Sequence, residues 1–203
     1  LIIGGGDGGM LREALRHPVD RVTMIEIDDS VVELSKTWLP GISNGAFDDP
    51  RADLVIEDGA RFMAETDRSF DVIIVDSTDP MGPGEVLFTS EFYGHCKARL
   101  NPGGVMTTQS GVVMIQGGEL TTTVRRLGGH FADAHGYIAA VPTYAGGFMA
   151  FGWGTDDLSL RQLSTDRLQE RFAAINLATK YYNPDLHRGA FALPSYVAER
   201  VEA

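Results

Sequence analysis

The fold of this chain is decided by the stretch Phe70-Asp71-Val72-Ile73-Ile74-Val75-Asp76-Ser77-Thr78-Asp79-Pro80-Met81-Gly82-Pro83. Its first half has the length and apolar character of a buried strand. The strand runs into two carboxylates, Asp76 and Asp79, on a loop that Pro80 and Pro83 stiffen. Because ligands of open α/β sheets bind outside the carboxyl ends of the strands, paired acids at this position indicate a functional site.

Four other apolar runs end in the same way. Residues 1–3 lead into a glycine-rich turn, residues 21–25 into Glu26, residues 52–56 into Asp58-Gly59, and residues 105–108 into Gln109. If these runs are parallel strands, their acidic residues meet at one edge of one sheet. That group consists of Asp7, Glu26, Asp58, Asp76 and Asp79.

Helical patterns separate the apolar runs, and strands that alternate with helices favour an α/β fold. We predict a Rossmann-like, doubly wound, mostly parallel sheet of the methyltransferase type. Residues 132–141 and 148–153 are predicted to form an antiparallel hairpin at its edge. The helical patterns cover residues 10–16, 30–39, 60–65, 90–100, 119–127, 167–175 and 190–200.

Composition narrows the class of protein. The 203 residues carry a formal net charge of -11, which argues against nucleic-acid binding because that function needs a basic face. No apolar run is long enough to span a membrane. The single cysteine, Cys96, excludes an internal disulfide framework and fits a reducing cytoplasm, and we predict that it is buried. The sequence contains no Cys/His cluster of the kind that binds a metal ion. We expect one catalytic domain over residues 1–203, with C-terminal helices from about residue 165 packed on it.

The clustered acids predict the charge of the ligand. Carboxylates held close together repel one another and raise one another's pKa. A cationic ligand relieves that repulsion. The sequence therefore predicts an acidic pocket for positively charged small molecules.

The glycine turn suggests what else the ligand carries. Gly4-x-Gly6-x-x-Gly9 follows a strand, and Glu26 ends the next strand, where a carboxylate can bind ribose hydroxyls. A dinucleotide would place a pyrophosphate against the turn, and Asp7 would repel it. Asp7 instead favours a sulfonium or an ammonium, unless it only caps the following helix.

Further residues have paired interpretations. Asp58 can bind an adenine amine or cap a helix, and Ile27 can pack on a base or belong to the core. Asp76 and Asp79 can activate and anchor a primary amine, or cap their own loop. Tyr144, on a Pro/Gly-rich loop, can orient the amine or pack on its own turn.

Taken together, these motifs resemble the polyamine aminopropyltransferases, the spermidine synthase family. The resemblance covers essentially the whole chain, and residues 76–83 are its most specific part. It continues in Pro142-Thr143-Tyr144 and in Lys180-Tyr181-Tyr182-Asn183-Pro184. It implies a methyltransferase-like fold, decarboxylated S-adenosylmethionine as co-substrate and a diamine such as putrescine as acceptor. It implies no metal or bound cofactor.

The resemblance also implies roles for individual residues. Asp76 would act as the base for the attacking amine, helped by Tyr144, and Asp79 would bind the diamine. Asp7 would face the aminopropyl group, and Gln109 would line the site.

On the nucleoside side, Glu26 would bind the ribose hydroxyls and Asp58 the adenine amine. Ile27 would lie against the base, and Gly59 and Pro83 belong to the same substrate site.

Two departures from the family pattern stand out. Family members usually carry a small N-terminal β domain, which adds residues near the acceptor and dimer contacts. The 203 residues do not include it, and a homodimer stays open. Members often have an acid shortly after the glutamine of the fifth strand, where this chain has Gln109-Ser110-Gly111.

Three rival hypotheses remain. An S-adenosylmethionine-dependent methyltransferase fits the sheet and Glu26 but not the pair Asp76 and Asp79. A domain that binds a nucleoside or a polyamine without turnover fits the absent N-terminal part but not the retained Asp76 and Tyr144. An NAD-dependent oxidoreductase ranks last because of Asp7.

Overall fold

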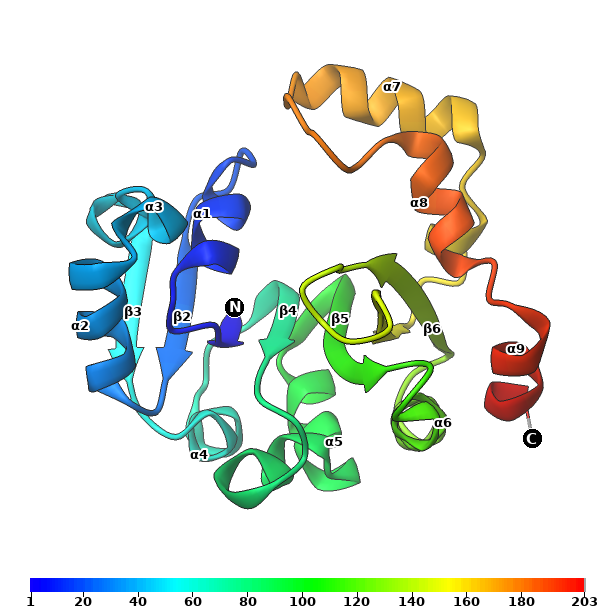
Figure 1. Ribbon diagram of the computed structural model, residues 1–203, viewed down its shortest axis with the longest axis horizontal. Helices are drawn as coiled ribbons and strands as arrows, with labels where there is room; N and C mark the ends of the chain where they lie inside the picture. The colour runs from blue at the N-terminus through cyan, green and yellow to red at the C-terminus, as the bar shows by residue number, and fades with distance from the viewer. Residues whose placement is uncertain (203) are drawn as a thin grey trace.

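The computed structural model describes residues 1–202. Its centre is a seven-stranded sheet with the order β3-β2-β1-β4-β5-β7-β6, and helices cover its faces (Figure 1). The first five strands pair in parallel, whereas β7 runs antiparallel to both β5 and β6. The prediction of a doubly wound, mostly parallel sheet with an antiparallel edge hairpin is confirmed.

The strands are β1 (Ile2–Gly4), β2 (Val22–Glu26), β3 (Ala52–Ile56), β4 (Phe70–Asp76), β5 (Leu100–Val112), β6 (Asp133–Ala140) and β7 (Phe148–Thr155). The α-helices are α1 (Gly9–Leu15), α2 (Asp29–Trp38), α3 (Pro40–Ser43), α4 (Gly59–Glu65), α5 (Ser90–Ala98), α6 (Gly117–Gly128), α7 (Thr165–Ile175), α8 (Pro184–Phe191) and α9 (Ser195–Glu202). Short 3₁₀ helices are η1 (Ala46–Asp48), η2 (Gly82–Phe88) and η3 (Leu160–Gln162).

The core forms on both faces of the sheet because successive side chains of a strand point to opposite sides. In β1, Ile2 packs with α1 through Leu11 and Leu15. Its neighbour Ile3 belongs to the other cluster, with Phe62 of α4 and Phe92 of α5. A strand covered on both faces must be apolar throughout, which explains the continuous apolar runs in the sequence.

The sole cysteine lies inside the second of these clusters. Cys96 of α5 is fully buried, as predicted. Burial raises the pKa of its thiol because the low-dielectric core disfavours the thiolate.

The C-terminal helices contact the sheet and α6. Phe191 of α8 packs on Tyr137 of β6 and Trp153 of β7, with ring centroids 5.4 and 5.3 Å apart. Val197 of α9 packs with Leu120 and Val124 of α6. The connector between α7 and α8 reaches across to the N-terminal half of the chain, where the Arg16 guanidinium donates to the carbonyl of Ala178.

One predicted helix is wrong. Residues 190–200 do not form a single helix, because α8 ends at Phe191 and α9 begins at Ser195. Pro194 lies between them, and a proline has no N–H to donate and excludes its predecessor from the α region. Sequence patterning also missed α3 and η2, which are short turns inside proline-containing loops.

None of the helices within residues 1–202 has both the length and the apolar character needed to cross a bilayer.

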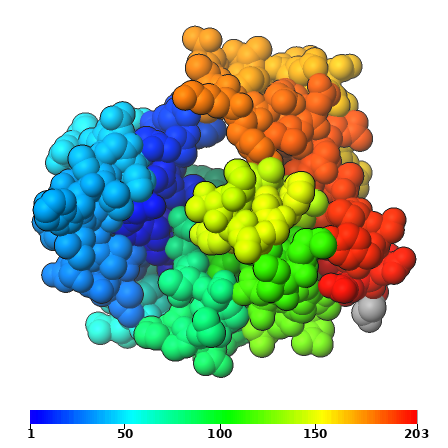
Figure 2. All heavy atoms as spheres, in the orientation of Figure 1, coloured from blue at the N-terminus to red at the C-terminus, as the bar shows by residue number. Residues whose placement is uncertain are grey.

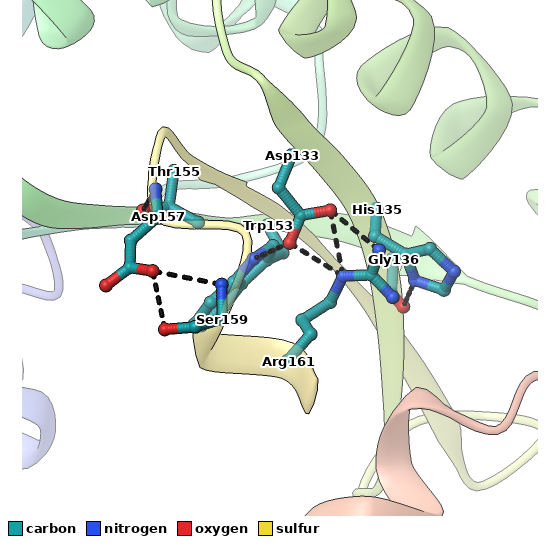
Figure 3. A network of polar contacts seen from close by, with 8 residues as sticks. All are labelled: Asp133, His135, Gly136, Trp153, Thr155, Asp157, Ser159 and Arg161. Atoms are coloured by element: carbon teal, nitrogen blue, oxygen red, sulfur yellow. Dashed lines mark hydrogen bonds and ion pairs between the residues drawn. The ribbon is translucent and has the colours of Figure 1, made fainter. Parts of the chain in front are cut away.

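An ion pair between the buried Asp133 and the partly exposed Arg161 stabilises the edge of the sheet at β6 (Figure 3). The Arg161 guanidinium donates to both oxygens of Asp133, at 2.6 to 3.0 Å. Trp153 Nε1 donates to the same carboxylate at 3.2 Å. Asp133 is 6% exposed, so its charge depends on these donors instead of on water. The pair joins η3 to the start of β6.

Loss of Arg161 leaves the buried Asp133 carboxylate with no cation beside it and with the Trp153 N–H as its remaining donor. We expect Arg161→Met to lower the free energy of unfolding by about 3 kcal/mol, because the Asp133 charge then stays buried without a cation to offset it. Urea denaturation measures the change. The matched control is Arg167→Met, which breaks the exposed pair of Arg167 with Glu170 and should change stability by about 0.5 kcal/mol or less. Equal decreases in the free energy of unfolding of the two variants would contradict a special role for Arg161.

Candidate active site

A cavity of about 580 Å³ opens beyond the carboxyl ends of the strands in the N-terminal half of the sheet. Its volume suits a small ligand. Figure 2 shows an opening on this face between the blue N-terminal segment, the yellow segment and the orange C-terminal segment, and the cavity itself is lined by residues between 3 and 87 and by Tyr144. The structure brings eight of the ten predicted site residues to the wall of this one cavity: Asp7, Glu26, Ile27, Asp58, Gly59, Asp76, Pro83 and Tyr144.

The turn after β1 is glycine-rich because it passes between two acids at very short range. The N–H of Gly5 donates to the carbonyl of Asp76 at 2.9 Å. Gly4 has φ +85°, and a Cβ there would lie 2.2 Å from that same carbonyl oxygen. A Cβ on Gly6 would lie 2.8 Å from Glu26 Oε2. Larger residues would push the turn away and separate the acids.

Two acids hold the backbone with one oxygen and line the cavity as well. Asp7 Oδ1 accepts from the N–H of Gly9 at 2.8 Å, at the start of α1. Asp58 Oδ1 accepts from the N–H of Ala60 at 2.8 Å and caps α4. Within residues 1–202 the second oxygen of each carboxylate receives no hydrogen bond. Capping and ligand binding are thus compatible interpretations of both residues.

Glu26 and Ile27 form the wall at the end of β2. Glu26 is 8% exposed, and its Oε1 accepts from the N–H of Asp28 at 3.1 Å. Ile27 is 57% exposed, which is unusual for a large aliphatic side chain next to a buried strand. A carboxylate beside an exposed apolar ledge can bind a ligand that has hydroxyl groups next to a flat apolar face.

Asp76 is the acid with the most unusual environment. It ends β4 beside Gly4 of β1. Burial, the first cause, and the nearby charges of Asp7 and Glu26 raise the pKa of its carboxyl above the usual value. Among residues 1–202 no side chain or backbone donor bonds to this carboxylate. A carboxyl group that has a raised pKa and no hydrogen-bond donor, and that lies in a cavity, is a candidate for a catalytic group.

The remaining two predicted residues do not line the cavity. Asp79 Oδ2 accepts from Gln116 Nε2 at 2.9 Å. Gln109 is 6% exposed, and its Nε2 donates to the carbonyl of Thr78 at 3.0 Å. Gln109 therefore supports the loop of the paired acids, and Gln116 is a contact that sequence analysis missed.

Tyr144 stands on the other side of the cavity. It lies in the tight turn between β6 and β7, where its N–H donates to the carbonyl of Val141 at 3.1 Å. The side chain is 51% exposed. Packing of the ring on its own turn would have buried it more deeply.

No three His, Cys, Asp or Glu side chains in the described part of the chain converge as ligands of a metal ion would.

Known proteins resemble this chain over most of its length. Residues 1–164 match the spermine/spermidine synthase domain family. The chain belongs to that family.

Individual members of the family are close relatives. "Polyamine aminopropyltransferase 1" of Pseudomonas aeruginosa is 56% identical over 202 residues, which are 99% of this chain and 71% of the relative. The polyamine aminopropyltransferase of Ruegeria sp. is 57% identical over 198 residues, or 97% of this chain and 70% of that protein. A crystal structure of spermidine synthase in complex with the transition-state analogue AdoDATO matches with a TM-score of 0.91 and 36% identity, over 99% of this chain and 68% of that one.

Membership in the spermine/spermidine synthase family agrees with the sequence-based recognition and with the observed sheet. The roles of the single residues stay predictions.

The crowding of acids in this family member has a consequence for stability. The folded-state pKa of Asp76 lies above its unfolded value, so the charged form destabilises the fold at a pH above that folded pKa. The penalty disappears below the unfolded pKa, where both states are protonated. We expect Asp76→Asn to raise the melting temperature at neutral pH and to give progressively less gain as the pH falls toward about 4.

Thermal unfolding followed by circular dichroism at several pH values measures this effect. Asp20→Asn, at an exposed position, is the matched control and should leave the melting temperature unchanged. A lower melting temperature for Asp76→Asn at neutral pH would mean that the carboxylate is stabilised instead of repelled.

Proposed function

We propose that this chain transfers the aminopropyl group of decarboxylated S-adenosylmethionine to putrescine, giving spermidine and methylthioadenosine. The observation that carries the proposal is the Asp76 carboxylate, which lies unpartnered in an acidic cavity beside a glycine turn and an exposed apolar ledge. The named activity of the relatives supports aminopropyl transfer. The choice of putrescine is our own.

The acidic wall suits both substrates because both are cations. The co-substrate carries a sulfonium and an ammonium, and the acceptor carries two ammonium groups. We assign the ribose hydroxyls to Glu26, the adenine amine to Asp58 and the face of the base to Ile27. Gly59 and Pro83 complete this wall, and Asp7 faces the aminopropyl end.

The reaction is a single displacement. The acceptor nitrogen attacks the methylene carbon beside the sulfonium, the new C–N bond forms, and the C–S bond breaks with its electron pair going to sulfur. Sulfur leaves as the neutral thioether of methylthioadenosine. The acceptor nitrogen must first be neutral, because an ammonium has no lone pair.

We assign Asp76 as the base that accepts this proton from the acceptor nitrogen. A carboxylate with a raised pKa is a better proton acceptor than an ordinary one at neutral pH. The Tyr144 hydroxyl orients the amine. Asp79 lies on the loop whose residues Ser77 and Thr78 line the cavity, and we assign it to the acceptor. Because the leaving group is already good, holding the nitrogen and carbon in line supplies much of the rate. The displacement needs neither a metal nor a bound cofactor, and we place it in the cytoplasm.

A product assay tests the proposal. Purified protein is incubated with decarboxylated S-adenosylmethionine and putrescine, cadaverine, agmatine or spermidine, and the products are identified by mass spectrometry. We expect spermidine and methylthioadenosine in equal amounts from putrescine. A methylated product from S-adenosylmethionine would instead indicate a methyltransferase, and binding of methylthioadenosine without turnover would indicate a binding domain.

Asp76→Asn in the same assay tests the base. We expect kcat to fall roughly a hundredfold or more, since general-base catalysis contributes at least that much. The dissociation constant of methylthioadenosine, measured by calorimetry, should stay within about twofold. Unaltered turnover would remove Asp76 from the reaction.

Asp79→Ala tests the acceptor site. We expect the KM for putrescine to rise about tenfold or more, because a charge-assisted hydrogen bond to the amine is lost. The KM for the nucleoside co-substrate should be unaffected. Asp185→Ala, at an exposed position of α8, is the matched control. A rise in the nucleoside KM alone would place Asp79 on the wrong substrate.

A further inference from the structure

The strand that follows the site has an irregularity at the level of the acidic loop. The pairing of β5 with β7 shifts register between Gln109 and Val112, and Gly111 has φ +76°. Two backbone N–H groups in this bulge donate to side chains. Gly111 donates to Gln109 Oε1 at 2.9 Å, and Val112 donates to Gln116 Oε1 at 2.8 Å.

These two bonds fix the direction of both amides. A backbone N–H can only donate, so each amide must turn its oxygen toward the bulge and its NH₂ group away from it. The NH₂ groups then point at the loop after β4. Gln109 Nε2 donates to the carbonyl of Thr78 at 3.0 Å, and Gln116 Nε2 donates to Asp79 Oδ2 at 2.9 Å. Either amide turned over would face donor to donor and acceptor to acceptor.

Gln116 has little room for another position. Its own N–H donates to the carbonyl of Val112 at 2.7 Å. Its Oε1 and Cβ lie 2.9 and 3.1 Å from where a Cβ on Gly111 would stand. The side chain therefore lies flat against the glycine of the bulge, which holds it between β5 and the loop.

The loop depends on these two side chains. Within the described residues, the Gln109 and Gln116 amides supply the two hydrogen bonds that reach residues 77–80 from outside this loop, one from β5 and one from the N-cap of α6. The other bonds of this segment are local, such as Met81 N–H to the carbonyl of Asp79. A neutral amide also leaves the charge of Asp79 in place, whereas a lysine there would neutralise it and repel a cation.

We propose that Gln116, supported by Gln109 through the same bulge, is a positioning residue that holds the Asp79 carboxylate for the acceptor amine. One oxygen of Asp79 bonds to the amide, and the other is left for the ammonium. The inference rests on the proposed function, because it takes Asp79 to be the acceptor site.

Gln116→Met tests the proposal, because methionine has a similar length and no polar hydrogen. We expect the KM for putrescine to rise about tenfold, the effect of one hydrogen bond to a charged group. The kcat and the dissociation constant of methylthioadenosine should change less than about twofold. Gln169→Met, at an exposed position of α7, is the matched control and should match the wild type.

A double variant separates positioning from a general loss of structure. If Gln116 acts through Asp79, then Asp79→Ala combined with Gln116→Met has the same putrescine KM as Asp79→Ala alone. A double variant whose putrescine KM rises by the product of the two single increases would overturn the proposal. A Gln116→Met enzyme with the wild-type KM for putrescine would do the same.

Failure of the proposed function is distinguishable from failure of this inference. Calorimetry with putrescine titrated into protein saturated with methylthioadenosine gives acceptor binding without turnover. A wild type that makes no spermidine rejects the function, yet weaker putrescine binding by Gln116→Met still supports the positioning role, and equal binding overturns it. A wild type that neither reacts nor binds putrescine overturns both.

Discussion

The arrangement of the cavity depends on the hydrogen bond between the N–H of Gly5 and the carbonyl of Asp76. This bond continues the pairing of β1 with β4 past the end of the strands, into the turn. It brings Asp7 and Asp76 within the range of each other's charge, while Gly6 lets Glu26 approach from the other side. A side chain at Gly4 would break the contact, and the acids would then belong to separate loops. The electrostatics of the site are thus a consequence of a backbone contact that only glycine permits.

Such crowding destabilises the folded chain, and the packing around it offsets the loss. Ile2 and Ile3 of β1 pack in two different apolar clusters, one on each face of the sheet. The turn cannot relax without pulling β1 out of both. A group of mutually repelling charges can persist where the packing of the surrounding core fixes the backbone. Proteins retain such unfavourable arrangements mainly at functional sites.

Much of this could be read from the sequence because it follows from periodicity and strand ends. Apolar runs identified the strands, and the acids that follow them identified the edge where the cavity lies. Gln116 escaped detection for a physical reason. It lies beyond a bulge, and a bulge shifts the register so that spacing no longer tells which residue faces the loop. Gln109 was predicted to line the site, but it is not in the cavity wall, and its role as a support follows from a hydrogen bond to the Thr78 carbonyl that no pattern encodes. The break at Pro194 was readable in principle, since proline ends a helix at its predecessor.

The burial of Cys96 gives the protein a built-in reporter of its own opening. A thiol reagent must reach a thiolate, and the folded core both shields the sulfur and raises its pKa. Modification can therefore proceed only through states in which α5 has separated from the sheet. The rate of labelling then follows the population of these open states, and comparison with amide exchange tells whether α5 opens alone or with the whole domain. Because the chain has one cysteine, this signal comes from a single known place in the core.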